Sequence, residues 1–322
     1  AVPGCRVVAL AGRRGDQATA AAAAVPGARG FGSWREMLDA GGIDAVSIAV
    51  PPAAQPEIVI AAAERGLAVF CEKPAACDAA AAATMLAAVR EHRVAHAVNF
   101  LFPEIPAWQA ARRVVTDMVG RAPLRQASVA WRVETYAHRH DLHDGWKRSP
   151  AHGGGALSTF VSHSAYALEW LCGPVRAVLA RLLPSAADDA RVMAWLDFES
   201  GLRASLDVAM NCPFGSGHRL EIYGADGAIV LDNPSSDYVR GFDLRAQSRG
   251  AAAPVHADAV PGHDDGRIWA TSRIAARFIE RVRNGGTGGP DLVAGLRVQR
   301  ILDACRTSDR SGAWVEVPRG DH

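Results

Sequence analysis

The first hundred residues alternate short apolar runs with helical segments. The predicted strands cover residues 6–11, 44–50, 67–71 and 94–99. The predicted helices between them cover residues 16–24, 33–38, 57–65 and 78–92. Ser33 followed by Glu36 has the spacing of a capping box at one of these helix starts. Strands and helices alternating at this spacing predict right-handed βαβ units and a parallel sheet.

The pattern changes after about residue 102. The predicted strands become alternating or closely spaced, at residues 124–133, 175–183, 191–198, 202–210, 218–223 and 228–231. The predicted helices cover residues 103–120, 156–171, 268–283 and 292–305. This pattern predicts an antiparallel sheet with one face covered by helices, and residues 248–265 form a predicted surface loop. We therefore expect two domains, residues 1–102 and residues 103–322.

Composition narrows the class of protein. Of the 322 residues, 49% are hydrophobic and 21% charged, and the formal net charge is +1. Such a balance is typical of a globular protein and gives no reason to expect a nucleic-acid or membrane partner. No apolar run reaches membrane-spanning length, no signal peptide is visible, and the six cysteines form no CxxC pair. We expect reduced thiols and a cytoplasmic location.

Lysine usage is unusual. Lysine and arginine together number 35, yet the only lysines are Lys73 and Lys147. A lysine retained against this bias indicates a site that needs a compact amine able to exchange a proton, because arginine has too high a pKa for that role. Chance is the alternative for either lysine. Lys73 follows a predicted parallel strand, and ligands bind at the carboxyl ends of strands in open α/β sheets.

An ordered series of motifs runs along the chain. It comprises Ile-Asp-Ala-Val at 43–46, Pro-Pro at 51–52, Gly-Leu at 66–67, Glu-Lys-Pro at 72–74, Gly-Gly-Gly-Ala-Leu at 153–157, His163 and Leu-Cys-Gly at 171–173. From about residue 5 to the C-terminus, this series resembles the glucose–fructose oxidoreductase / inositol dehydrogenase / MocA family. The resemblance implies a Rossmann domain that binds NAD or NADP, followed by an α+β domain with a large, mostly antiparallel open sheet and the substrate pocket.

The resemblance also assigns roles to residues. It places Lys73 of Glu-Lys-Pro beside the nicotinamide, where it orients the substrate hydroxyl or moves its proton, and it places Glu72 nearby. His163 matches the family's acid–base histidine. Thr159 stands where the family has an aspartate four residues before that histidine, so we expect Thr159 to help by hydrogen bonding only. A structural histidine remains the alternative for His163.

The start of the chain departs from the family. No GxGxxG loop is present, and residues 6–11 align with the second strand of the family, so the first βα unit is apparently missing. Either a Gly-rich loop precedes Ala1, or the protein has abandoned its cofactor. Arg13 and Arg14 follow the strand at 6–11, where arginines suit the 2′-phosphate of NADP rather than the ribose hydroxyls of NAD. Two solvated arginines are the alternative.

Further candidates come from the loops. Pro51 and Pro52 are expected to shape the cofactor path, and Asn99 and Trp146 to border the substrate pocket. Residues 138–144 contain three histidines and two aspartates, but their irregular spacing does not favour a metal site, and we expect no metal.

Three functional hypotheses follow. The leading one is an NADP-preferring oxidoreductase that moves a hydride between nicotinamide and a hydroxyl or keto carbon of a sugar-like or polyol substrate. The second is a cofactor-independent lyase, isomerase or cyclase that uses Lys73 and His163 as acid–base groups. The third is a non-catalytic binding protein. By resemblance, the open sheet also implies a homo-oligomer, a dimer or a tetramer.

Overall fold

Parallel strands and helices form the N-terminal part of the computed structural model. The structure describes residues 2–140, 142, 145–186, 188–235, 237–249, 258–262, 265–285 and 289–319. In chain order the elements are β1 (Ala9–Ala11), α1 (Gly15–Ala23), β2 (Arg29–Phe31), α2 (Trp34–Asp39), β3 (Ala45–Ile48), α3 (Gln55–Glu64), β4 (Ala68–Cys71), α4 (Ala79–Glu91) and β5 (His96–Val98). All their strand pairs are parallel, as the alternating pattern predicts.

These five strands form two sheets rather than one. β1 pairs with β2, and β3, β4 and β5 form a separate sheet in that order. No ladder joins β1 to β3 among the described residues. Every β4 residue is buried, because helices cover both faces of a parallel sheet. The carboxyl ends of β3, β4 and β5 therefore lie along one edge, where ligands bind in such folds.

Local capping explains where two of the helices begin. Asp78 accepts a hydrogen bond from the backbone N–H of Ala81 at 2.8 Å and so starts α4. Ser33 caps α2 but accepts from Arg35 at 3.1 Å, not from Glu36. The predicted cap is therefore present, while the reciprocal capping box is not the arrangement that forms.

The second part is a large twisted sheet with helices on one face. Its elements are α5 (Pro106–Arg121), β6 (Leu124–Arg132), α6 (Tyr136–Arg139), α7 (Ser162–Cys172), β7 (Val175–Ser185), β8 (Asp188–Phe198), β9 (Arg203–Ala209), β10 (Gly217–Gly224), β11 (Gly227–Asn233), β12 (Asp243–Ser248), α8 (Gly266–Asn284), α9 (Leu292–Ser311) and β13 (Val315–Glu316). The strand order is β12-β11-β10-β6-β9-β8-β7-β13, and only the β6–β9 pair is parallel.

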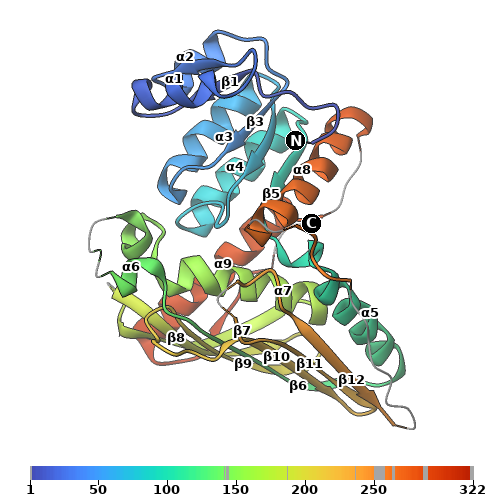
Figure 1. The fold of residues 1–322 in the computed structure, drawn as a ribbon. Coiled ribbons are helices and arrows are strands. Elements are labelled where there is room, and N and C mark those ends of the chain that lie inside the picture. Colours follow the sequence, from blue (N-terminus) through green and yellow to red (C-terminus); the bar gives the residue numbers. More distant parts are fainter. Residues whose placement is uncertain are drawn as a thin grey trace.

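The two parts contact each other closely. Figure 1 shows α7 between the large sheet and the parallel-strand part, while the opposite face of the sheet is free of helices. The C-terminal helices return to the first part, where α9 packs against α4 and β5, and α8 packs against β4 and β5. Gly153 lies against Pro52, whose Cβ would be 2.7 Å from a side chain added at Gly153. The edge that carries Lys73 therefore faces the large sheet.

The expected α/β fold class, with a Rossmann-like part and a mostly antiparallel open sheet, is confirmed. The helix predicted over residues 156–171 begins with a π turn, Leu157–Val161, before α7. The strands β2, β12 and β13 were not predicted, because β2 and β13 are very short and the six residues of β12 are mostly polar. Much of the predicted loop at 248–265 lies outside the described residues. In the part of the chain that the structure describes, no helix is long and apolar enough to cross a membrane.

Candidate active site

Lys73 lies directly after β4, at the carboxyl end of the strand. Its Nζ donates a hydrogen bond to the backbone carbonyl oxygen of Thr159 at 2.8 Å, across the junction between the two parts. The pKa of Lys73 is lowered to about 8, mainly by burial and to a smaller extent by the charges of Lys147 and Arg267, while the charge of Glu72 opposes the change. With this pKa the amine can exchange its proton near pH 8, and the role expected from the scarcity of lysine stays a prediction.

Thr159 reaches Lys73 through its main chain. It lies in the π turn Leu157–Val161, where backbone hydrogen bonds skip one more residue than in an α-helix. The expected side-chain hydrogen bond is not the contact that the structure shows; the carbonyl provides it instead. Such turns are frequent at functional sites because they redirect backbone groups. Residue type at position 159 therefore matters less than the backbone conformation.

His163 lies one turn beyond Thr159 and is 2% exposed. Its Nδ1 is buried and has no hydrogen-bond partner among the described residues. Burial, followed by the nearby charges of Lys73 and His218, lowers its pKa well below 6.5. His163 is therefore neutral at physiological pH, with the ring edge of Phe100 and the tilted ring of Phe102 beside it.

Asn99 and Glu72 extend the site along the strand ends. The amide of Asn99, after β5, donates to Glu72 Oε1 at 2.7 Å and to Thr271 Oγ1 at 3.2 Å. Its Oδ1 is buried and unpartnered among the described residues. Asn99 is thus held by Glu72 while its Oδ1 remains a free acceptor among the described residues; its expected place at the substrate pocket stays a prediction.

Gln55 supports the same loop from behind. Its side-chain nitrogen donates to the carbonyl oxygen of Pro74 at 2.8 Å, and the residue is fully buried. Gln55 begins α3 just after Pro51 and the short 3₁₀ turn Pro52–Ala54. Gln55, which closely follows the Pro-Pro segment, therefore links the start of α3 to Glu-Lys-Pro by a direct hydrogen bond.

The large sheet contributes residues that sequence reasoning missed. His218 of β10 stacks on Trp131 with ring centroids 4.4 Å apart, and burial lowers its pKa to about 3. Tyr238 lies 6.0 Å from the ring of His163, and Arg267 at the start of α8 hydrogen-bonds to Tyr238. His218 starts a predicted strand, but nothing in the strand pattern showed which helix it would face. Tyr238 lies in a loop without any recognisable motif.

Arg13 and Arg14 lie between β1 and α1, and both are exposed. Arg14 is the N-cap residue of α1 and makes no side-chain cap. An anion at this helix start would meet two guanidinium groups and free backbone N–H groups. The position is compatible with the expected role toward a phosphate, although it lies on the separate β1–β2 sheet.

Trp146 is partly buried in a 3₁₀ turn, Trp146–Arg148, whose backbone packs against Gly154. The turn therefore lies over the glycine segment that leads to the π turn. In the preceding loop, Asp141, His143 and Asp144 lie outside the described residues. Among the residues that are described, no group of three or more His, Cys, Asp or Glu side chains could hold a metal ion.

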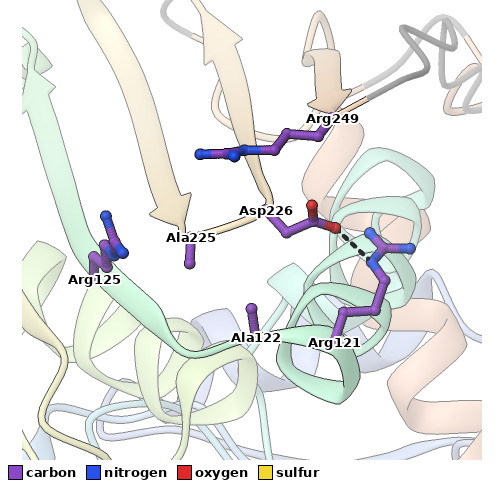
Figure 2. A pocket seen from close by; sticks show the side chains of 6 residues that line it. All are labelled: Arg121, Ala122, Arg125, Ala225, Asp226 and Arg249. Atoms are coloured by element: carbon purple, nitrogen blue, oxygen red, sulfur yellow. Dashed lines mark ion pairs between the residues drawn. The ribbon is translucent and has the colours of Figure 1, made fainter.

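A separate hollow of about 530 Å³ lies at the far end of the large sheet. Figure 2 shows Arg121, Arg125 and Arg249 around it, with Arg121 paired to Asp226 at 3.0 Å. None of the expected site residues lines this hollow. The chemistry-bearing groups gather instead at the junction of the two parts.

The junction fits the nicotinamide end of a dinucleotide. It offers an amine with a lowered pKa, a neutral histidine and the unpartnered Oδ1 of Asn99, which could accept from a carboxamide. No glycine-rich turn before a helix is found at the β1–β3 gap among the described residues, so the fit concerns the nicotinamide end alone.

The fold and the junction together define a dinucleotide-type oxidoreductase with a second, sheet-based domain. The family model for "Oxidoreductase family, NAD-binding Rossmann fold" matches residues 1–100, and that for "Oxidoreductase family, C-terminal alpha/beta domain" matches residues 125–317. The chain belongs to the glucose–fructose oxidoreductase / inositol dehydrogenase / MocA family.

Characterised proteins are among the relatives. The chain is 26% identical to a levoglucosan dehydrogenase of Pseudarthrobacter phenanthrenivorans, over 92% of this chain and 87% of the relative. It is 26% identical to an inositol 2-dehydrogenase of Pseudomonas fluorescens, over 98% and 89%. A solved levoglucosan dehydrogenase in complex with NADH and levoglucosan has a TM-score of 0.84 at 24% identity, covering 98% of this chain and 90% of that one. These matches support the oxidoreductase hypothesis, not the lyase, isomerase or cyclase alternative.

Proposed function

We propose that this protein is an NADP-preferring dehydrogenase or reductase acting on a hydroxyl or keto carbon of a sugar-like or polyol substrate. The observation that carries the proposal is the hydrogen bond of 2.8 Å from Lys73 Nζ to the Thr159 carbonyl, which holds an amine of lowered pKa at the strand ends beside His163. The names of the dehydrogenase relatives support the substrate class.

The chain's own residues would handle the proton. A bound nicotinamide would supply or accept the hydride. The neutral amine of Lys73 would take the proton of the substrate hydroxyl as the carbonyl forms, and the Thr159 carbonyl would hold the resulting ammonium. His163, neutral because it is buried, would orient the same oxygen by hydrogen bonding without adding charge. Asn99 would border the pocket, with Trp146 on its far side.

Arg13 and Arg14 support the preference for NADP. Both lie at the start of α1, and neither forms an ion pair with any of the described residues, so a 2′-phosphate could bind them without displacing a carboxylate. Pro51, Pro52 and Glu72 would shape the path between this end and Lys73. The complexes of the solved relatives contain NADH, so the preference would be a property of this chain.

Self-association through the open sheet is a further part of the proposal. The helix-free face carries a shallow hollow of about 270 Å³ lined by residues of β6, β8 and β9. Trp195 lies on it with 50% of its surface exposed. A large half-exposed aromatic side chain on a broad sheet face is typical of a subunit contact, and a homodimer or tetramer would cover it.

Titration with NADPH and NADH, followed by nicotinamide fluorescence, tests the proposal. We expect micromolar binding of NADPH and weaker binding of NADH. Arg13→Ala with Arg14→Ala should weaken NADPH binding at least tenfold and leave NADH binding nearly unchanged. Arg113→Ala, on α5 outside the site, is the matched control. Absence of micromolar binding for both nucleotides would refute the dehydrogenase assignment.

A further inference from the structure

Asp189 is a buried carboxylate that none of the roles above uses. It lies at the start of β8 and is 1% exposed. Its Oδ2 accepts a hydrogen bond from the backbone N–H of Leu157 at 2.8 Å. Leu157 is the first residue of the π turn that contains Thr159. The carboxylate therefore lies on β8 but caps the start of this turn, as an N-cap side chain does for a helix.

A bulge in β8 directs the carboxylate to this position. In the β7–β8 ladder Leu183 pairs with Arg191 and Pro184 with Asp189, so Ala190 is an extra residue that forms a bulge. Bulges redirect side chains, and here both Asp189 and Ala190 are buried although they are adjacent in a strand. The bulge therefore turns Asp189 away from the free face of the sheet and toward the helices.

Gly155 provides the space that the carboxylate occupies. A Cβ at Gly155 would overlap Asp189 Oδ1, and the backbone φ of +80° is one that other residues rarely adopt. The third glycine of the Gly-Gly-Gly segment is thus explained by Asp189. A bulge, a glycine and a π turn all meet at one side chain.

We propose that Asp189 is a positioning residue for Lys73. Its carboxylate fixes the first backbone amide of the π turn. The conformation of that turn then places the Thr159 carbonyl oxygen against the ammonium of Lys73. The carboxylate acts over two hydrogen bonds and one turn of backbone without touching the lysine. Only the catalytic consequence rests on the proposed function; the coupling to Lys73 does not.

The charges around Asp189 are few. Burial raises its pKa to about 7, whereas the Leu157 N–H and Arg306 of α9 oppose the increase and Asp188 adds to it. Arg306 is itself held by Asp303 at 2.7 Å and contacts Ser158 of the π turn at 3.3 Å. The cap is therefore fully charged only above neutral pH, and its strength changes within the physiological range.

The two-lysine composition allows a direct test. Selective ¹³C labelling of lysine gives one Cε resonance each for Lys73 and Lys147, and Lys147→Arg assigns them. We expect Lys73 to titrate near pH 8 in the unmodified protein. Asp189→Ala removes the acceptor of the Leu157 N–H and should lower that midpoint by roughly half a pH unit to one pH unit, because a misdirected carbonyl no longer stabilises the ammonium. Asp243→Ala, which removes an exposed carboxylate of β12, should leave the midpoint unchanged.

The unmodified protein gives a second measurement should Asp189→Ala fail to fold. The amide proton of Leu157 should resonate downfield, because it is hydrogen-bonded to a carboxylate at 2.8 Å. A folded Asp189→Ala variant with an unaltered Lys73 midpoint, or a Leu157 amide proton without that downfield shift, would overturn the proposal. Neither measurement needs a nucleotide or substrate, so a failed dehydrogenase assignment would be recognised separately.

Discussion

At the scale of single residues, Lys73 is defined by what surrounds it. It shares its loop with Glu72, is held by a carbonyl from the other part of the molecule, and is buried enough to have a pKa of about 8. His163 beside it stays neutral because burial and Lys73 both disfavour its charged form. The pKa of Lys73 lies in the physiological range and that of His163 does not, so the proposed proton exchange involves the lysine rather than the histidine.

The pH dependence of substrate oxidation follows from this difference. Lys73 acts as a base when neutral, so kcat/KM for oxidation should rise with pH through about 8 and then level off, while that for the reverse reduction should fall above 8. Because the pKa of His163 lies well below 6.5, no further limb is expected between pH 6 and 7. Lys73→Met should remove the limb near 8 and lower kcat by about 10²–10⁴-fold. Arg125→Met, at the distant hollow, should change neither the rise of kcat/KM near pH 8 nor kcat. A Lys73→Met variant that keeps this rise would show that another group causes it.

The sequence identified Lys73, Glu72, Asn99 and His163 through motifs and strand ends, and the structure brings these four residues together. The sequence did not identify the contact made by Thr159, because every residue type has a backbone carbonyl and its use cannot be read from the side chain. His218, Tyr238 and Asp189 were missed for a related reason. They come from distant strands and a loop, and only the packing of the sheet against α7 places them near the site.

At the scale of elements, α7 depends on a buried ion pair at its C-terminal end. Glu169 Oε1 accepts hydrogen bonds from the Val175 N–H at 2.7 Å and from Arg297 Nε at 2.9 Å. The carboxylate thereby joins α7 to the start of β7 and to α9. The pair is mostly buried, with side-chain exposures of 15% for Glu169 and 18% for Arg297. Removing one member leaves the other charge without compensation in a place of low water access.

Glu169→Leu should therefore lower the free energy of unfolding by about 3–5 kcal/mol, measured by urea denaturation. The exposed pair of Arg35 and Glu57 provides the control, since Glu57→Leu should cost less than about 1 kcal/mol. Equal losses for the two variants would show that the Glu169 link does not hold α7 in place.

Element positions were largely predictable from periodicity, because long amphipathic helices and alternating strands carry strong signals. The π turn was not predictable, because residues 156–171 have the hydrophobic pattern of one continuous helix. The interruption arises from contacts at Asp189 and Lys73, which lie far away in the sequence. The short strand β2 escaped detection because it has three residues, of which only Phe31 is a large apolar one.

At the scale of the whole molecule, the large sheet has two different faces. One is covered by helices and carries the site, and the other presents Trp195 among half-buried ion pairs such as Arg132–Asp207 and Arg191–Asp207. Figure 1 shows this second face without a helical layer. A face that keeps its charges paired while exposing an indole ring suits contact with a second copy of the chain.

We expect Trp195→Glu to shift the protein from an oligomer to a monomer in size-exclusion chromatography with light scattering, because a charge at the centre of a contact costs several kcal/mol. Trp314→Glu alters a comparably exposed aromatic residue near the C-terminus and should leave the mass unchanged. A monomeric unmodified protein at micromolar concentration would refute the proposed self-association.

The separate β1–β2 sheet has a consequence for motion. In the part of the chain that the structure describes, no backbone ladder joins this small unit to the β3–β4–β5 sheet. Segments with few cooperative links open at lower free energy than the core. Arg13 and Arg14 belong to this small unit, whereas Lys73 follows β4 of the other sheet. A molecule that bound to both units would reduce the local opening of the smaller one. Part of its binding free energy would then offset the entropy lost when that unit becomes ordered.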